Sequence, residues 1–298
     1  MRLRKLLLAL LLCWVNYSAA ELHILSYNVE NLFYRHNHYW QKIDAISKVV
    51  TTSCGWEHPV LVGLQEVEKD SCLRDLCYRM RSMHYRYVHY DSPDKRGIDV
   101  ALLYDSTRFS VLHSRPVQIP LGHTTTRDLL YVCGVLDDYD NQLGNDTLHL
   151  IVCHLPSQLG GKQETQWKRD SAVAKIQGLV DSIGQIVPKA QIIVLGDMNN
   201  SPMDNLPSMT NCCLYGPKKG QGTHKYQGIW TFLDQFYVSS SLTGRTSVRV
   251  MTDSWLLEED KKYLDYKPKR SYVGLRWNNG YSDHLPLILT ISTSPTYD

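Results

Sequence analysis

Short apolar runs rich in valine, isoleucine, leucine and tyrosine recur along almost the whole chain and indicate β-strands. We predict strands at His23–Val29, Val60–Glu66, Tyr85–His89, Asp99–Tyr104, Tyr131–Leu136, Leu148–His154, Gln191–Leu195, Leu233–Ser239 and Leu287–Ser292. No Pro/Gly/Ser-rich linker, internal repeat or block of charge separates these runs. The pattern therefore predicts one domain with a large β-component.

Two segments carry the spacing of an amphipathic helix. In Lys162–Val187 apolar residues recur at intervals of three and four, and Tyr39–Val50 shows the same pattern over a shorter length. Because strands outnumber helices, simple alternation of strand and helix does not describe the chain. We expect an α/β fold with a two-sheet core and helices packed outside it.

Residues 1–20 have the three parts of a secretory signal peptide. Three cations open the segment, Leu6–Val15 form an apolar stretch, and Ser18-Ala19-Ala20 is a small-residue cleavage site. The alternative, a membrane anchor, needs about 20 apolar residues, and this stretch is too short. We expect cleavage after Ala20, a mature domain at residues 21–298, and a periplasmic or secreted protein without stable membrane insertion.

The charge balance changes once the leader is removed. The chain has 32 Lys+Arg against 30 Asp+Glu, for a net charge of +2, and the leader takes three of those cations with it. A mature net charge of −1 argues against a protein that binds nucleic acid by bulk positive charge. The 43% hydrophobic content excludes a disordered tail or low-complexity scaffold.

Export permits disulfide bonds, and seven of the 8 cysteines follow the leader. An odd number leaves at least one of them unpaired within a monomer. We predict Cys72 and Cys77 as the most plausible local pair, and Cys133 and Cys153 as buried thiols within strands. No CxxC spacing occurs, which disfavours a structural zinc site.

Polar side chains follow several of the predicted strands, at the point where each apolar run ends. They are carboxylates, carboxamides and imidazoles, in the order Asn28, Glu66, His154, Asp197, Asn199, Asp234, Asp283 and His284. If these strands share a sheet, their ends converge in one place. Carboxylates and carboxamides suit Mg²⁺ or Mn²⁺, and imidazoles suit phosphate oxygens and proton transfer. Any one of these residues is more simply explained as a turn or surface residue, but the ordered set indicates a phosphate-ester hydrolase.

The motifs around these residues are SYNVEN, LQEVE, RGIDVALLY, HLPS, GDMNNSP, FLDQF and SDHLP. In this order, from about Leu22 to Ile291, the sequence resembles the endonuclease/exonuclease/phosphatase superfamily, in particular its exported bacterial members. The resemblance implies a deoxyribonuclease-I-like fold. This fold is a four-layer α/β/β/α sandwich in which two packed mixed β-sheets are flanked by helices.

The resemblance also implies a metal site with one or two Mg²⁺ or Mn²⁺ ions. Glu66 would be the principal ligand, Asn28 would order the metal and the phosphate, and Asp283 would add a metal contact. Arg96 lies where relatives present a phosphate-binding side chain. Asp99 lies where relatives support a histidine, and strand alternation leaves open whether it faces the site.

The catalytic residues follow from the same resemblance. Asp197 would orient or deprotonate the attacking water, and Asn199 would hold its geometry and a phosphate oxygen. His284 would contact the scissile phosphate with its ring fixed by Asp234, and His154 would be a second phosphate contact. Arg169 could reach a phosphate, but we expect a solvated arginine on its helix.

The substrate class is predicted by excluding the substrates of other members of the superfamily. Asn199 is followed by Asn200-Ser201-Pro202 rather than by the Asn-Tyr-Arg run of inositol phosphatases. A sphingomyelinase would expose apolar residues for membrane docking, and the one candidate, Trp255–Leu257, is better interpreted as a partly buried helix start. We therefore prefer a monomeric phosphodiesterase acting on nucleic acid or nucleotide fragments, with a phosphatase or lipid phosphodiesterase as the alternative.

Two further questions stay open from the sequence. Lys218, Lys219, Lys225 and the six cations of 261–276 form either a phosphate-facing rim or solvated loops. A secreted binding module without catalysis is a remote alternative. It is disfavoured because such a protein should have lost at least one of the four residues Glu66, Asp197, His154 and His284.

Overall fold

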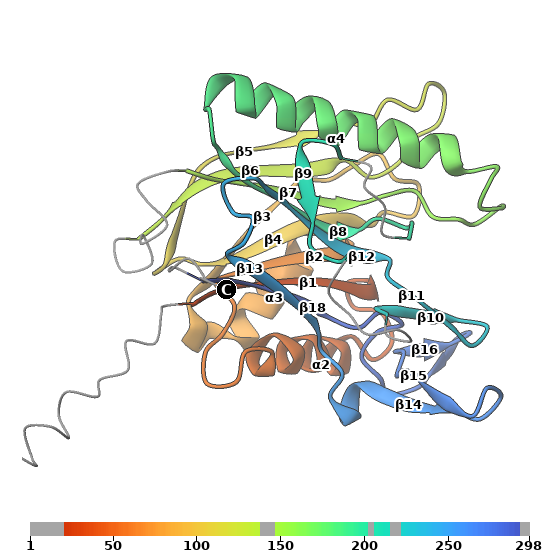
Figure 1. The fold of residues 1–298 in the computed structure, drawn as a ribbon. Coiled ribbons are helices and arrows are strands. Elements are labelled where there is room, and N and C mark those ends of the chain that lie inside the picture. The colour runs from red at the N-terminus through yellow and green to blue at the C-terminus, as the bar shows by residue number, and fades with distance from the viewer. Residues whose placement is uncertain (1–20, 138–146, 202–205, 215–221, 293–298) are drawn as a thin grey trace, which may run out of the picture.

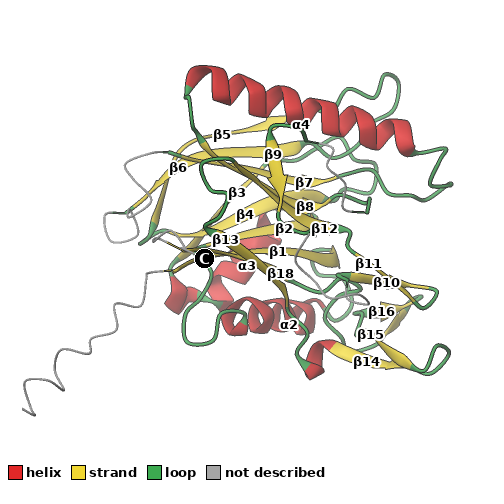
Figure 2. Cartoon of the chain, viewed as in Figure 1, coloured by secondary structure: helices red, strands yellow, loops and turns green. Residues whose placement is uncertain are grey.

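The computed structural model describes residues 21–137, 147–201, 206–214 and 222–292. Two six-stranded sheets pack face to face, and helices cover their outer faces (Figure 1, Figure 2). The predicted four-layer α/β/β/α sandwich is thus confirmed. The predicted leader and the lysines at 218 and 219 lie outside the described residues.

The first sheet is mixed, with β1 and β2 parallel and its other neighbours antiparallel. Its strand order is β13 (Thr246–Val250), β18 (Leu287–Ser292), β1 (Glu21–Leu32), β2 (Leu61–Val67), β4 (Asp99–Asp105) and β3 (Tyr85–His89). The parallel pair brings the C-terminal ends of β1 and β2 to the same edge of the sheet.

The second sheet repeats this arrangement, with β7 and β8 as its parallel pair. Its strand order is β5 (Phe109–Val117), β6 (Leu129–Leu136), β7 (Leu148–His154), β8 (Gln191–Asp197), β12 (Asp234–Ser239) and β9 (Met209–Asn211). Each sheet therefore has one parallel pair at its centre, and the ends of these pairs carry the predicted site residues.

Apolar side chains fill the space between the sheets and beneath the helices. The inter-sheet layer includes Ile24, Leu102, Val152, Leu195 and Phe236, each at most 1% exposed. Helices α2 (Tyr39–Thr52) and α3 (Asp70–Arg79) cover the first sheet, and α4 (Gln166–Ile186) covers the second. Within the described residues, no helix combines the length and apolar character needed to cross a bilayer.

Three two-stranded hairpins extend from one end of the sandwich (Figure 1). They are β10 (His224–Tyr226) with β11 (Ile229–Thr231), β14 (Leu257–Asp260) with β15 (Asp265–Pro268), and β16 (Tyr272–Val273) with β17 (Arg276–Trp277). The predicted helix start at Trp255 is a single 3₁₀ turn, Ser254–Leu256, which leads directly into β14.

Helix α3 was not predicted, because only Cys72, Leu73 and Leu76 face the core and charged residues surround them. The helix also explains why the predicted Cys72–Cys77 disulfide is wrong. Residues five apart on a helix project about 140° from one another, so the two thiols point to different sides. All seven cysteines of the described chain are free, with Cys153 buried as predicted and Cys133 half-buried.

Candidate active site

The strand registers bring most of the predicted site residues to one edge of the sandwich. In the parallel pairs, Asn28 lies opposite Gln65 and His154 lies opposite Asp197. The antiparallel strand β12 begins at Asp234, which is also opposite Asp197. A cleft of about 590 Å³ opens at this edge, and its lining includes Glu66, Arg96, His154, Asp197, Asn199 and His284.

Asn28 holds the two carboxylates of the cleft side by side. Its Nδ2 donates to Asp197 Oδ2 at 3.1 Å and to Glu66 Oε1 at 3.4 Å. Its Oδ1 accepts from the backbone N–H of Glu30 at 3.0 Å, which fixes the orientation of the amide. The amide oxygen is therefore already engaged, and Asn28 supports the carboxylates with its nitrogen.

Backbone irregularities aim the side chain of Glu66 at the cleft. Glu66 has a left-handed φ of 69°, and the pairing of β2 with β4 shifts between Gln65 and Val67. A bulge of this kind turns one side chain out of the regular alternation of a strand. The second carboxylate oxygen of Glu66 accepts from the backbone N–H of Asn31 at 2.8 Å, which holds the side chain in place.

The glycine of the GDMN motif allows β8 to approach β7 closely. Gly196 has a φ of 141°, and a Cβ at this position would lie 1.9 Å from the carbonyl oxygen of Cys153. Any larger residue would push the two strands apart. Gly196 therefore sets the distance between the two residues that follow on these strands, His154 and Asp197.

Asp197 combines an elevated pKa with a fixed orientation. Burial raises its pKa to about 6, against the opposing effect of the positive charge on His284. Its Oδ1 accepts from the backbone N–H of Asn199 at 2.8 Å, while Oδ2 faces Asn28 and the two histidines. A carboxylate with a pKa close to neutral is suited to accept a proton from water.

His284 is held as a cation by Asp234. Its Nδ1 lies 2.7 Å from Asp234 Oδ2, and its Nε2 lies 3.9 Å from Asp197 Oδ2. Burial would lower its pKa, but the negative charges of Asp234, Asp197 and Asp283 raise it well above the ordinary value for histidine. His284 therefore presents an N–H donor and a positive charge to the cleft.

His154 lies beside the same carboxylates but is neutral. Its Nε2 is 3.5 Å from Asp197 Oδ2 and 3.9 Å from Glu66 Oε1. Burial holds its pKa well below the ordinary value, and the nearby positive charges of Arg127 and Arg96 lower it further. The pKa values of the two predicted histidines are thus shifted in opposite directions, which favours the neutral form of His154 and the cationic form of His284.

Asn199 and Arg96 complete the predicted lining. Asn199 has a left-handed φ of 47°, and its Nδ2 donates to the carbonyl oxygen of Leu155 at 3.0 Å. The side chain of Arg96 is 49% exposed, so it can move to meet an anionic substrate. Asp283, in contrast, does not line the cleft, and its Oδ2 accepts from Arg270 Nη2 at 2.9 Å.

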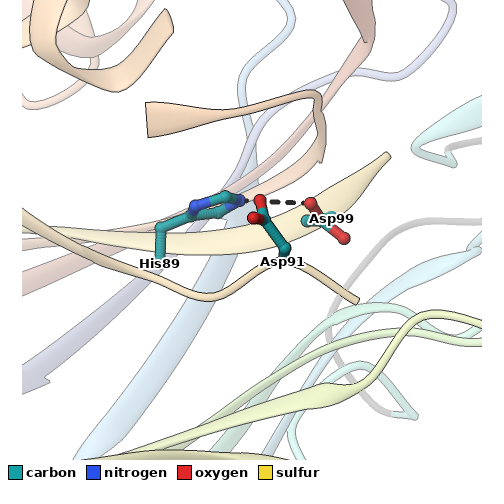
Figure 3. A group of neighbouring side chains, drawn as sticks. All are labelled: His89, Asp91 and Asp99. Carbon is teal, nitrogen blue, oxygen red and sulfur yellow. Dashed lines mark hydrogen bonds and ion pairs between the residues drawn. The ribbon is translucent and has the colours of Figure 1, made fainter. Parts of the chain in front are cut away.

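Asp99 belongs to a separate group, with His89 and Asp91, outside the cleft (Figure 3). Its Oδ2 lies 3.2 Å from His89 Nε2, and its Oδ1 accepts from the backbone N–H of Ser92 at 3.0 Å. The other ring nitrogen of His89 lies 2.8 Å from Asp70 Oδ1. Burial lowers the pKa of His89, but its bonds to Asp99 and Asp70 outweigh this effect and raise the pKa overall. Asp99 therefore supports His89 and does not face the site.

Arg169 is not solvated and does not line the cleft, so the prediction of a solvated helix arginine is wrong. Its side chain is fully buried and donates to the carbonyl oxygen of Lys162 at 2.6 Å and to Thr165 Oγ1 at 2.9 Å. Longer bonds reach the carbonyl oxygens of Pro156 and Ser157. Arg169 thus ties the loop after His154, which lines the cleft, to helix α4.

Replacing Arg169 by methionine should lower the free energy of unfolding by about 3 kcal/mol, because three buried or partly buried carbonyl oxygens lose their donor. Urea denaturation followed by circular dichroism would measure the change. The exposed Lys175 on the same helix provides a control, and Lys175→Met should stay within about 0.5 kcal/mol of the wild type. Equal stability of the two variants would contradict the role assigned to Arg169.

Two residues near the site carry no sequence signal. His224 lies against His284 with ring centroids 4.9 Å apart and lines the cleft. Arg127 is buried beneath His154, where its Nε donates to the His154 carbonyl oxygen at 3.0 Å. Neither belongs to one of the seven motifs, and each reaches the site through tertiary packing.

In the part of the chain that the structure describes, the basic residues at Lys225 and 261–276 do not form a phosphate-facing rim around the cleft. Lys225 points to Asp265, and no residue of 261–276 lines the cleft. Arg270 of this stretch pairs with Glu30 and Asp283 instead. The described lysine and arginine residues that do line the cleft are Arg96 and Lys162.

Comparison with known proteins identifies the family. Residues 23–293 match the endonuclease/exonuclease/phosphatase family. The chain belongs to this family. The resemblance seen in the motifs is thereby confirmed, and the chain is a member of a family of phosphate-ester hydrolases. No curated protein matches the chain.

Solved structures of the same fold cover nearly the whole chain. Truncated Caenorhabditis elegans TDP2 is 17% identical with a TM-score of 0.63, covering 91% of this chain and 98% of that one. D. rerio TDP2 complexed with a single-strand DNA product is 15% identical with a TM-score of 0.60, covering 91% and 98%. A mannosyl-6-phosphatase from Bacteroides thetaiotaomicron is 16% identical with a TM-score of 0.61, covering 90% and 98%. At these identities the likeness shows the fold.

Proposed function

We propose that this protein is an exported, divalent-metal-dependent phosphodiesterase that hydrolyses nucleic acid or nucleotide fragments by in-line attack of water. The observation that carries the proposal is the convergence of Glu66, Asp197, His154 and His284 on the lining of one cleft. Export rests on the leader, and we expect the mature protein to begin at Glu21.

The donor set of the cleft fits a hard divalent cation. Mg²⁺ is usually bound by one or two carboxylates together with water and substrate phosphate, rather than by a closed protein cage. Glu66 and Asp197 are held side by side by Asn28, and Glu66 would be the principal ligand. When bound, the cation would offset negative charge on the phosphate and lower the pKa of nearby water.

Side chains of the cleft would carry out proton transfer and bind the phosphate oxygens. Asp197, with a pKa of about 6, would accept a proton from the attacking water. His284, held as a cation, would donate to a phosphate oxygen on which negative charge develops, and neutral His154 would donate a second hydrogen bond. Asn199 would keep Asp197 in position through its backbone N–H.

The apolar part of the cleft lining supports a phosphodiester substrate. Exposed apolar side chains also line it, with Leu159 at 88%, Tyr226 at 66% and Ile229 at 67% exposure. Such a rim can contact organic groups attached to the phosphate, whereas a monoester of a polar alcohol would use it little. The D. rerio TDP2 structure holds a single-strand DNA product on the same fold, which supports the preference for nucleic acid.

Removal of divalent metal should abolish activity, and added Mg²⁺ or Mn²⁺ should restore it. The mature protein would be assayed with Mg²⁺ or EDTA on plasmid DNA, RNA, a bis-aryl phosphodiester, an aryl monoester and sphingomyelin. We expect metal-dependent cleavage of the diester and of nucleic acid. Cleavage of the monoester alone would overturn the diester preference, and cleavage of sphingomyelin alone would favour a lipid substrate.

A further inference from the structure

The β10–β11 hairpin presents one face to the cleft and the other to a neighbouring hairpin. His224 pairs with Thr231 and Tyr226 pairs with Ile229 across the two strands. All four side chains line the cleft, as the two-residue alternation of a strand requires. The intervening pair, Lys225 and Trp230, belongs to the opposite face.

Contacts on this opposite face hold the hairpin rigidly. Lys225 Nζ donates to Asp265 Oδ2 at 2.6 Å and to the carbonyl oxygen of Tyr266 at 2.8 Å. Trp230 Nε1 donates to the same carboxylate oxygen of Asp265 at 3.2 Å. The hairpin is therefore anchored to β15, so its cleft-facing side chains form a wall that is already in place before substrate binds.

His224 supplies the imidazole of this wall. Its ring centroid lies 4.9 Å from that of His284. Two imidazolium rings at this distance would repel each other, and Asp234 places the positive charge on His284. Burial, followed by the charge of His284, lowers the pKa of His224 to about 4, so its ring is neutral at pH 7.

A neutral imidazole keeps one N–H donor. Among the described residues, no side-chain or backbone group makes a hydrogen bond to the ring nitrogens of His224. The donor is therefore available to a molecule in the cleft. His154 and His284 both lie within 3.9 Å of Asp197, on the side where the water would be activated, whereas His224 makes no ion-pair contact with Asp197.

We propose that the β10–β11 hairpin is the leaving-group wall of the cleft. His224 donates a hydrogen bond to the departing ester oxygen, and Tyr226 and Ile229 contact an aromatic or apolar group attached to that oxygen. This inference rests on the proposed phosphodiesterase function and assigns the part of the site that recognises the leaving alcohol.

The reaction step balances with one water molecule. The water oxygen forms a bond to phosphorus while the opposite P–O ester bond breaks, and the bonding electron pair stays on the ester oxygen. The proton of the attacking water passes to Asp197. The hydrogen bond from His224 stabilises the negative charge that develops on the departing oxygen, which then takes a proton from solvent.

A leaving-group series tests the role of His224. The substrates are methyl aryl phosphodiesters whose phenols range in pKa from about 7 to about 10. His224→Ala should lower kcat/KM about 10-fold for the best leaving group and about 100-fold for the poorest, because poor leaving groups need the hydrogen bond most. His224→Gln keeps an N–H donor and should recover part of the loss. The exposed His113 on edge strand β5 gives the control His113→Ala, which should match the wild type.

Each outcome of the series has a definite meaning. A loss that is equal across the series, or no loss, overturns the role of His224 and leaves the proposed phosphodiesterase intact. A wild-type protein that cleaves no member of the series with Mg²⁺ overturns both. Tyr226→Ala and Ile229→Ala should raise KM for aryl diesters more than for dimethyl phosphate, and unchanged KM values would overturn the apolar part of the wall.

Discussion

Replacement of Asp197 by asparagine is expected to lower kcat by about three orders of magnitude, because the cleft then lacks its proton acceptor. Asparagine keeps nearly the same shape and can still accept from the backbone N–H of Asn199, while the hydrogen bond that Asn28 Nδ2 donates to the second carboxylate oxygen is lost. Burial disfavours the charged form of Asp197, as its raised pKa of about 6 indicates, so a neutral side chain should not destabilise the fold. Steady-state rates on the bis-aryl diester at saturating Mg²⁺ would measure the loss.

The stability of this variant separates chemistry from folding. Its urea midpoint should stay close to that of the wild type, because relief of the buried charge offsets the lost hydrogen bond from Asn28, while its turnover is lost. Near-normal turnover in a metal-replete assay would contradict the assignment of Asp197 as the base. A variant that is both inactive and markedly less stable would point to a structural role for the carboxylate instead.

Replacement of Asp234 by asparagine should shift the pH profile and lower kcat about 1,000-fold near pH 8. The negative charge of Asp234 is the largest of the effects that raise the pKa of His284 against burial. If the cationic form is needed, activity is present below that pKa and lost as the pH rises through it. Without the charge the pKa of His284 falls, so the alkaline limb of the kcat profile should move to lower pH.

Another Asp–His pair in the chain supplies a matched control. Asp105 Oδ2 lies 2.9 Å from His58 Nε2, outside the cleft, and Asp105 is as buried as a core residue. Asp105→Asn should leave the pH profile of kcat unchanged even if it lowers stability. A profile that moves equally in both variants would show that the shift is not specific to His284.

The sequence was informative wherever function lies at the end of a buried strand. Asn28, Glu66, His154 and Asp197 each follow an apolar run, and the register of a parallel pair then places them at a common edge. The local pattern of apolar and polar residues is sufficient to predict these positions, because a buried apolar run indicates both the strand and the residue at which it ends. The four-layer arrangement followed from the motifs around these same residues.

Residues that reach the site through tertiary packing could not be predicted in this way. His224 lies in a three-residue strand without an apolar run, and contacts between segments far apart in the sequence bring it over His284. These contacts are a backbone bridge between His224 and His284 and the anchoring of the hairpin to β15. Arg169 occupies a polar position in the amphipathic pattern of its helix. It is nevertheless buried, because its guanidinium donates hydrogen bonds to nearby loop carbonyl oxygens. The requirement for hydrogen-bond partners in a loop leaves no periodic signal in the sequence.

Glycine or asparagine would adopt the left-handed backbone of residue 66 at lower conformational cost than glutamate does. The strain at such a position is on the order of 1 kcal/mol, a noticeable share of the stability of a folded domain. A search for stabilising substitutions would therefore select against Glu66, the residue proposed to hold the metal. Thermostabilised versions of this protein should be screened for metal binding as well as for melting temperature. A stabilising substitution at residue 66 would remove the carboxylate that the proposed chemistry needs.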